Sequence, residues 1–381
     1  MEQTVGLYLH IPFCRSKCTY CDFYSLAGAE DRMDAYGAAL CRQMETAPAG
    51  LPVDTVYVGG GTPSWFGPSR LCALLEAVRR RFRLDPSAEI TVEANPDSVT
   101  EAGLRRLRSA GFNRISLGMQ SARDDELRRI GRPHDAAAVV RAVTAARAAG
   151  FDNLSLDLIY GLPEQTMDRW QGNVEAALAL APEHLSCYGL QAESGTPLYL
   201  KERDTLPDDD TQADLYLRAV ERLERAGYPQ YEISNFARPG RESRHNLRYW
   251  TLRPYLGFGP GAHSDFGGRR FSLPRDLEGY LRDAERGVFR RETDEAIGPA
   301  ERAAEYLMLR LRLRDGLEPK EYETALGLEF GPLEACFADW QRQGWAARER
   351  GRWHLTPAGF LLSNRLIGQA LEVQAEGGSA P

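Results

Sequence analysis

The sequence has no long apolar run and no excess of positive charge. Of its 381 residues, 47 are Lys or Arg and 54 are Asp or Glu, so the formal net charge is -7. A chain with this charge is not expected to bind nucleic acids through a general basic surface. No apolar run approaches the ~20 residues of a membrane-spanning helix. The stretch before Cys14 is too short and too polar for a signal peptide. We therefore expect a cytoplasmic protein without a membrane span or a nucleic-acid partner.

Cysteines are few, and their distribution does not suggest a disulfide framework. The chain has seven, and three of them lie close together at Cys14, Cys18 and Cys21. The other four are scattered through segments with helix or strand patterns, where cysteine is usually a small core residue. These four are Cys41, Cys72, Cys187 and Cys336. A reducing compartment follows, because clustered cysteines must remain thiolates to bind a metal.

The three clustered cysteines have the spacing CxxxCxxC and follow an apolar stretch that predicts a strand ending at Pro12. Thiolates suit zinc and iron-sulfur clusters. A structural zinc site usually has four protein ligands, but the sequence offers no second CxxC pair and no nearby histidine. Three thiolates can hold three irons of a four-iron cluster and leave the fourth open. The pattern favours such a cluster over a zinc site or a chance spacing.

Strand and helix patterns alternate over the first two-thirds of the chain, which predicts an α/β fold with a parallel sheet. An alanine-rich helix is expected at 136–149, with Gly150 as its C-cap. Six strand-helix units indicate a curved, partly open barrel, a partial (β/α)6 barrel. Its strands are expected at 5–12, 54–58, 89–93, 114–117, 154–159 and 184–188.

The carboxyl ends of these strands carry Cys14, Gly60, Glu93, Gln120 and Asp157. Ligands of parallel sheets bind at this edge, so these residues are candidates for a site. Each also has a purely structural interpretation. The glycine run at 59–61 suits a tight turn, Glu93 could face solvent, and Asp157 in an apolar strand needs a partner. The residues alone leave both interpretations open.

The last third of the chain predicts a second, mainly helical domain. Helices are expected from residue 299, at 320–326, at 332–343 and at 357–371, with a hairpin at 345–356. Three helices and a hairpin resemble a winged helix, although the negative charge of the chain disfavours DNA binding. The expected boundaries are a barrel at 1–235, a connecting segment at 236–298, a winged-helix-like domain at 299–372 and a frayed tail at 373–381.

Five stretches of the chain together resemble the radical SAM superfamily. Within it they resemble the branch that holds the oxygen-independent coproporphyrinogen III dehydrogenase and the HemW family of heme chaperones. The stretches are 10–14, 20–23, 59–63, 118–121 and 157–163. The resemblance implies that Cys14, Cys18 and Cys21 bind a [4Fe-4S] cluster whose open position takes S-adenosylmethionine. It also implies nine residues at the S-adenosylmethionine site: Tyr8, Tyr20, Gly60, Gly61, Thr62, Glu93, Gln120, Arg132 and Asp157.

The implied roles agree with the chemistry of these side chains. Glycine amides and Thr62 can meet the methionyl amine and carboxylate, Arg132 can pair with a carboxylate, and acidic groups can accept hydrogen bonds from ribose hydroxyls. We expect a side chain at Gly61 to block S-adenosylmethionine. We also expect such a variant to keep its cluster, because the cysteines belong to another loop.

Two features separate the branches of this family. The dehydrogenase type has a fourth cysteine where this chain has Phe23, and a long extension where only thirteen residues precede Cys14. The chaperone type has an HNxxYW stretch, which is present here at 245–250. This stretch suggests that His245 ligates heme, with Tyr249 and Trp250 against the porphyrin. His263, in a glycine-rich loop, is a weaker candidate.

Two functions remain open. The first is a heme chaperone that holds heme, the cluster and S-adenosylmethionine, and passes heme to an acceptor protein such as a membrane respiratory enzyme. The second is an oxygen-independent coproporphyrinogen III oxidase (dehydrogenase) that uses a 5'-deoxyadenosyl radical in porphyrin biosynthesis. Phe23 and the HNxxYW stretch favour the chaperone, for which no catalytic residue is assigned.

Overall fold

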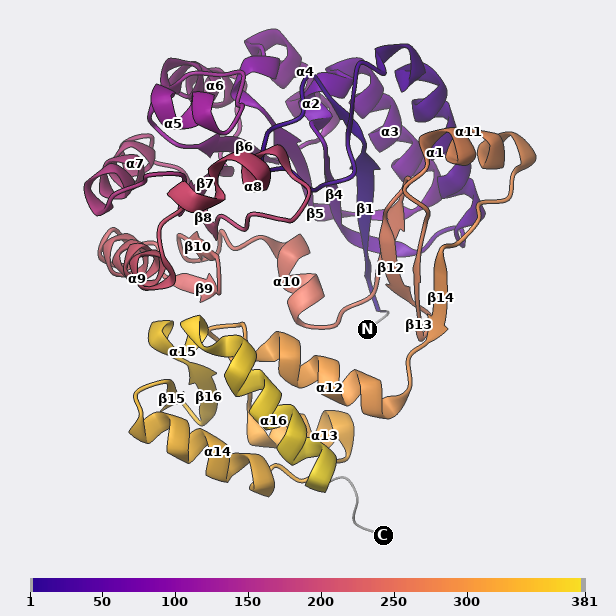
Figure 1. The fold of residues 1–381 in the computed structure, drawn as a ribbon. Helices are drawn as coiled ribbons and strands as arrows, with labels where there is room; N and C mark the ends of the chain where they lie inside the picture. The colour runs from indigo at the N-terminus through magenta and orange to yellow at the C-terminus, as the bar shows by residue number, and fades with distance from the viewer. Residues whose placement is uncertain (1–2, 378–381) are drawn as a thin grey trace.

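Twelve strands form one curved sheet in the computed structural model, which describes residues 3–377 (Figure 1). Six parallel strands make its centre, in the order β1-β4-β5-β6-β7-β8. Their bounds are Val5–Ile11, Pro52–Gly60, Arg83–Ala94, Arg114–Gln120, Leu154–Tyr160 and His184–Gly189. The predicted partial (β/α)6 barrel is confirmed.

Amphipathic helices cover the outer face of this sheet (Figure 1). Thr100, Asp135 and Thr166 cap three of them, each accepting a hydrogen bond from a backbone N–H in the first turn. The alanine-rich helix α6 ends at Ala148, and Gly150 follows it with φ of 90°. The long outer helices are α1 (Met33–Thr46), α3 (Pro68–Arg81), α4 (Glu101–Ala110), α6 (Ala136–Ala148), α7 (Met167–Ala179) and α9 (Asp209–Arg225). Three short helices lie between them: α2 (Pro63–Phe66), α5 (Asp124–Arg129) and α8 (Pro197–Glu202).

The sheet continues beyond the six predicted strands at both edges. Strand β11 pairs in parallel with β1, and the chain then returns through antiparallel strands β12, β13 and β14. At the other edge, β10 and β9 follow β8 in antiparallel pairing. These strands are Tyr255–Phe258, His263–Phe266, Arg269–Ser272, Thr293–Ala296, Asn235–Ala237 and Gln230–Glu232. Helix α11 (Leu277–Arg286) packs against α1.

The two faces of the central strands differ in chemistry. Leu117, Leu156 and Leu185 are fully buried in the apolar core. Their neighbours along the strands, such as Ser116 and Asp157, line a cavity inside the barrel. Because side chains alternate between the faces of a strand, one face builds the core and the other presents polar groups to a ligand.

Helix α10 (Arg244–Trp250) carries the HNxxYW stretch and covers the amino-terminal end of the barrel (Figure 1). Its first backbone N–H groups donate to the carboxylate of Glu89 on β5, which suits the positive end of a helix dipole. The buried Arg248 forms an ion pair with Asp54 at the start of β4. Helix α10 therefore closes the barrel floor.

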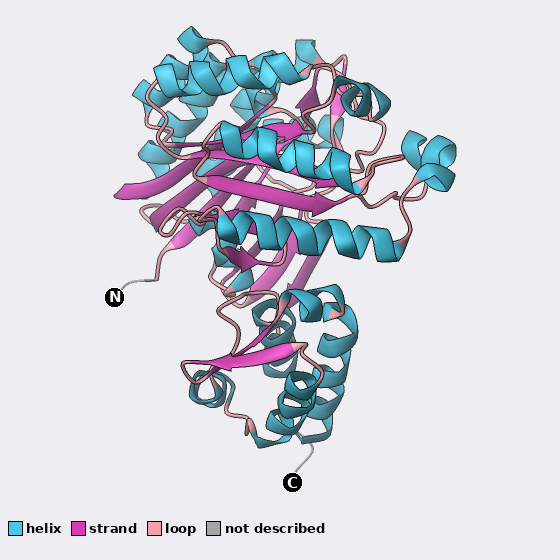
Figure 2. Ribbon diagram, turned by 90° about the vertical axis from the view of Figure 1, so that its left-hand side faces the viewer, coloured by secondary structure: helices cyan, strands magenta, loops and turns pink. Residues whose placement is uncertain are grey.

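The carboxy-terminal residues form a separate lobe (Figure 2). It contains α12 (Pro299–Arg310), α13 (Pro319–Leu326), α14 (Gly331–Arg342), the hairpin β15 (Ala346–Glu349) and β16 (Arg352–Leu355), α15 (Pro357–Leu361) and α16 (Ser363–Gly377). The single helix predicted at 357–371 is wrong, because Leu362 ends α15 and a new helix begins. Residues 373–377 of the predicted tail are helical, and 378–381 lie outside the described residues.

Among residues 3–377, no helix is both long enough and apolar enough to span a bilayer.

Candidate functional site

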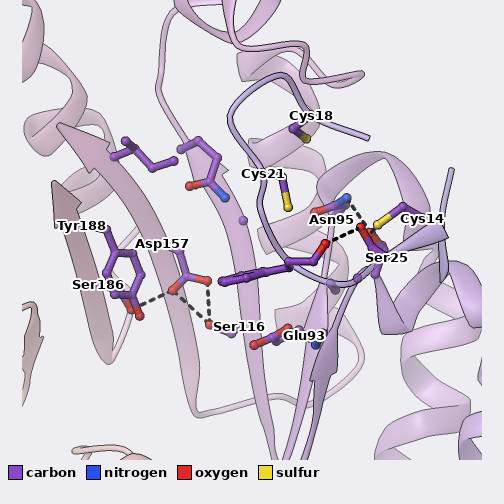
Figure 3. Close-up of a pocket in the computed structure, with 18 of the residues that line it drawn as sticks. Cys14, Cys18, Cys21, Ser25, Glu93, Asn95, Ser116, Asp157, Ser186 and Tyr188 are labelled. Atoms are coloured by element: carbon purple, nitrogen blue, oxygen red, sulfur yellow. Dashed lines mark hydrogen bonds between the residues drawn. The ribbon is translucent and has the colours of Figure 1, made fainter. Parts of the chain in front are cut away.

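A cavity of about 360 Å³ opens at the carboxyl ends of the central strands and extends into the barrel. The three cysteines lie at one end and Asp157 lies deeper, at the other end (Figure 3). Of the nine residues predicted to line the S-adenosylmethionine site, eight line this cavity: Tyr20, Gly60, Gly61, Thr62, Glu93, Gln120, Arg132 and Asp157. Tyr8 lines an adjacent cavity instead, and its hydroxyl hydrogen bonds to His10.

The cysteine loop leaves β1 through β2 (Phe13–Cys14) and returns through β3 (Leu26–Ala27). A turn closed from the Cys21 N–H to the Cys18 carbonyl brings the last two thiols near each other. Thr62 donates to the Cys14 sulfur at 3.4 Å, and Arg132 donates to the Cys18 sulfur at 3.5 Å. Burial raises the pKa of the Cys21 thiol.

The sulfur donors of the cysteine loop are of the type that binds iron-sulfur clusters. Within residues 3–377, no three His, Cys, Asp or Glu side chains converge on a point where they could share one metal ion. In a four-iron cluster each thiolate binds a different iron, so the sulfurs need not converge. Sulfur donors on one loop, beside an open cavity and a buried guanidinium, suit that group.

The glycine loop is packed directly against the cysteine loop. Gly60 has φ of 119°, which disfavours any residue with a Cβ. The Gly61 N–H donates to Ile11 O at 2.8 Å, and a Cβ at Gly61 would lie 2.8 Å from Phe13 O and 3.0 Å from the Cys14 sulfur. The reason for expecting that a side chain at Gly61 spares the cluster, that the cysteines belong to a separate loop, therefore does not hold. The two loops are distinct in sequence but touch in space.

Glu93 shapes the glycine loop. Its carboxylate accepts a hydrogen bond from the Tyr57 hydroxyl at 2.6 Å and from the Gly60 N–H at 3.1 Å. Burial raises the pKa of Glu93 to about 7, and the nearby charge of Asp157 adds to the increase, while both hydrogen bonds oppose it. The side chain therefore titrates near neutral pH at the wall of the cavity.

Arg132 is held by protein groups. Its guanidinium donates to Asn95 Oδ1 at 2.7 Å and to the Gly118 carbonyl at 3.0 Å, in addition to the Cys18 sulfur. These contacts leave Arg132 Nε without a hydrogen-bond partner within residues 3–377, and the pairing of Arg132 with a ligand carboxylate stays a prediction. Arg132 places a positive charge beside the cysteine loop. Gln120 ends β6 with φ of 61°, an uncommon conformation for a residue with a side chain.

The buried carboxylate of Asp157 has hydrogen-bond partners, as expected for a charged group in an otherwise apolar strand. Ser186 donates to its carboxylate at 2.7 Å, Ser116 donates at 3.0 Å, and Ser155 donates at 3.4 Å (Figure 3). Burial raises the pKa of Asp157, and the serine hydroxyls and the charge of Arg114 lower it. Arg114 itself is fully buried and lines the cavity, and its Nε has no hydrogen-bond partner within residues 3–377.

His245 is part of the barrel floor. Its side chain is 1% exposed. Both ring nitrogens are engaged, Nδ1 with the Thr55 hydroxyl at 2.9 Å and Nε2 with the Tyr249 hydroxyl at 2.7 Å. The ring also stacks on Tyr57 at a centroid distance of 5.2 Å. The prediction that His245 ligates heme with Tyr249 and Trp250 against the porphyrin therefore lacks support in this geometry, because no nitrogen is free for iron. His263, the weaker candidate, is exposed at the start of β12.

Sequence reasoning missed several residues of this cavity. Asn95 links Thr62 to Arg132 through hydrogen bonds at 3.2 and 2.7 Å. Ser116, Ser186 and Arg114 lie on the inner face of β6 and β8. The sequence did contain a signal for these residues. They are polar residues at alternate positions of otherwise apolar strands, and such residues mark the face of the sheet that does not join the core.

Comparisons with known proteins agree with this architecture. Residues 8–177 match the radical SAM superfamily, and residues 297–362 match the HemN C-terminal domain. The chain is 37% identical over 375 residues to the heme chaperone HemW of Bacillus subtilis (strain 168). The matched residues cover 96% of this chain and 98% of the relative. It is 40% identical over 374 residues to the heme chaperone HemW of Mycobacterium tuberculosis (strain ATCC 25618 / H37Rv), covering 96% and 94%. A solved structure, the radical SAM enzyme coproporphyrinogen III oxidase (HemN) from Escherichia coli, is 25% identical with a TM-score of 0.85, covering 97% and 90%.

Proposed function

Since the chain belongs to the HemW family of the radical SAM superfamily, we propose that it is a heme chaperone that binds heme and transfers it to an acceptor protein. The observation that carries the proposal is the similarity to named heme chaperones over 96% of the chain. The radical SAM domain implies an iron-sulfur cluster and S-adenosylmethionine as cofactors.

The alternative, oxidation of coproporphyrinogen III, is favoured only by the solved structure with the same fold. The chain is 25% identical to that oxidase, against 37% and 40% for the two chaperones. Phe23 stands where the resemblance places a fourth cysteine in the dehydrogenase type, and its ring is 69% exposed. A phenylalanine can neither ligate iron nor take part in thiol chemistry. The proposal therefore includes the absence of coproporphyrinogen oxidase activity.

In the proposed function, the cysteine loop holds the cluster through three thiolates. When bound, the cluster would supply electron transfer to S-adenosylmethionine. Gly60 and Gly61 leave room for a ligand close to the backbone, and Thr62 and Arg132 contact the cluster thiols. Asp157, deeper in the cavity, is suited to accept hydrogen bonds from ribose hydroxyls.

We propose only the kind of protein that accepts the heme, from the chemistry that heme transfer requires. A protein that receives heme after synthesis, such as a respiratory enzyme in a membrane, requires a donor that binds heme reversibly. The carboxy-terminal lobe, of which residues 297–362 match the HemN C-terminal domain, is a second surface available for such a partner. We place this exchange in the cytoplasm, where the cluster thiols stay reduced.

Two measurements on one anaerobically reconstituted sample test the proposal. Titration with heme should give a saturable Soret band. Incubation with coproporphyrinogen III, S-adenosylmethionine and reductant should give no protoporphyrinogen. A reconstituted sample that binds no heme, or that forms protoporphyrinogen with many turnovers, would contradict it.

A further inference from the structure

One histidine differs from all others in this protein. All six histidines lie within the described residues, and five are buried, with exposures of 7% or less: His10, His134, His184, His245 and His354. His10, His184 and His245 use both ring nitrogens in hydrogen bonds to neighbouring groups. His134 Nδ1 and His354 Nε2 have no partner within residues 3–377, but both side chains are buried. His263 is exposed, and its ring has no hydrogen-bond partner within residues 3–377.

His263 lines a second cavity, of about 400 Å³, beside the one that holds the cysteines. The cavity lies between β1, the loop that follows the cysteines and the glycine-rich loop before β12. Gly60 and Glu93 line both cavities, so the two share a wall. No residue predicted to bind the cluster lines this second cavity.

Three kinds of group meet in the second cavity. Arg275 is exposed and forms no ion pair or hydrogen bond with any described residue. The rings of Phe23, Tyr24 and Tyr255 supply aromatic surface, and the Phe23 ring is otherwise exposed to water. Partial burial and the charge of Arg275 lower the pKa of His263, so its imidazole is neutral at pH 7, the form that binds a metal.

A free imidazole, a free guanidinium and aromatic surface match the iron, the propionates and the faces of heme. We infer that heme binds in this second cavity, with His263 as an axial ligand of the iron and Arg275 paired with a propionate. This inference rests on the proposed heme binding and names its site. The cavity is smaller than heme and open to solvent at His263 and Phe23, so part of the ring stays exposed, as a carrier that must release its cargo requires.

The proposed heme site does not include His245 and the residues that hydrogen bond to it in the barrel floor. His245 and Trp250 do not line this cavity, and Tyr249 reaches it only as one wall residue. The HNxxYW stretch then stabilises the fold, and the glycine-rich loop supplies the ligand. Gly261 lies in that loop with φ of 78°, and a Cβ there would lie 3.3 Å from Arg275 Cγ, so the loop packs closely against the Arg275 side chain.

The test compares heme with iron-free protoporphyrin IX on the cluster-reconstituted full chain. For His263→Ala we expect a shifted Soret band and at least a tenfold weaker affinity for heme, with protoporphyrin IX binding unchanged. His263→Gly should regain the parent spectrum when imidazole is added, which a structural role would not allow. Arg275→Glu should weaken both porphyrins about tenfold or more, because a charge-assisted contact becomes repulsive.

Arg106→Glu is the matched control, since Arg106 is exposed on α4 and forms no ion pair in the described part of the chain. It should leave both affinities unaltered. If the parent binds heme but His263→Ala keeps its spectrum and affinity, the inferred site is wrong and the proposed function stands. If the parent binds no heme, the proposed function itself fails. Cluster content and circular dichroism of each variant establish that it has folded.

Discussion

Replacing His245 tests whether the HNxxYW stretch is structural. His245→Ala removes two buried hydrogen bonds, each worth about 0.5–1.5 kcal/mol, and leaves the hydroxyls of Thr55 and Tyr249 without that partner. It also opens a cavity beside the Tyr57 ring. Together these losses should lower the free energy of unfolding by about 3–5 kcal/mol at pH 7.5.

The pH dependence of this loss has a definite sign. Burial and the charge of Arg248 lower the pKa of His245 to about 3. Between pH 6.5 and 3 the unfolded chain takes up a proton that the folded imidazole does not, so the stability contributed by this residue is present above pH 6.5 and falls as the pH falls. By pH 5 the loss is about 2 kcal/mol. The difference between parent and His245→Ala should therefore shrink by that amount from pH 7.5 to 5.

Urea unfolding of the cluster-free protein, followed by tryptophan fluorescence at several pH values, measures both effects. Thr55→Val is the matched control, because it removes one partner and keeps the imidazole. It should cost about 1–2 kcal/mol and preserve most of the pH dependence. A His245→Ala protein as stable as the parent, with an altered heme spectrum, would refute this assignment and restore the stretch as a heme site.

Three further predictions concern the first cavity. Cys18→Ala should remove one thiolate and most of the roughly four irons and four sulfides per chain after reconstitution, and stoichiometric zinc in the parent, without cluster absorbance, would contradict it. Gly61→Val should lose both S-adenosylmethionine binding and cluster content, since its Cβ would lie 3.0 Å from the Cys14 sulfur; calorimetry and iron analysis check this, and an intact cluster would show that the loops move apart. In the parent, affinity for the cationic S-adenosylmethionine should rise as the pH increases through about 7, where Glu93 ionises. In the Glu93→Gln variant, the affinity for S-adenosylmethionine should no longer change as the pH passes through about 7. If the affinity depends on pH as in the parent, another group titrates.

The sequence by itself determined the central barrel and singled out the three cysteines that are predicted to bind the cluster. Alternating strand and helix patterns have a short period and depend on neighbouring residues, so the six central strands β1, β4, β5, β6, β7 and β8 could be predicted. The early start of β5 at Arg83 and the short strands β2 and β3 were not predicted. The cysteine spacing and the glycine run are also local, because they serve one loop each. Even the polar face of the barrel was visible as alternate polar residues in β6, β7 and β8.

Only the tertiary structure decided which of these local features touch. The glycine loop meets the cysteine loop because β1 and β4 are adjacent, and sheet order cannot be derived from either loop alone. His245 looked like a free ligand in the sequence, but β4 and α10 enclose it and use both its nitrogens. The place of His263 was also decided by the tertiary structure. Strands β11 to β14 extend the sheet beside β1, and this puts His263 at the wall of the second cavity. Burial and the supply of hydrogen-bond partners depend on segments distant in the chain, so they set the role of each histidine.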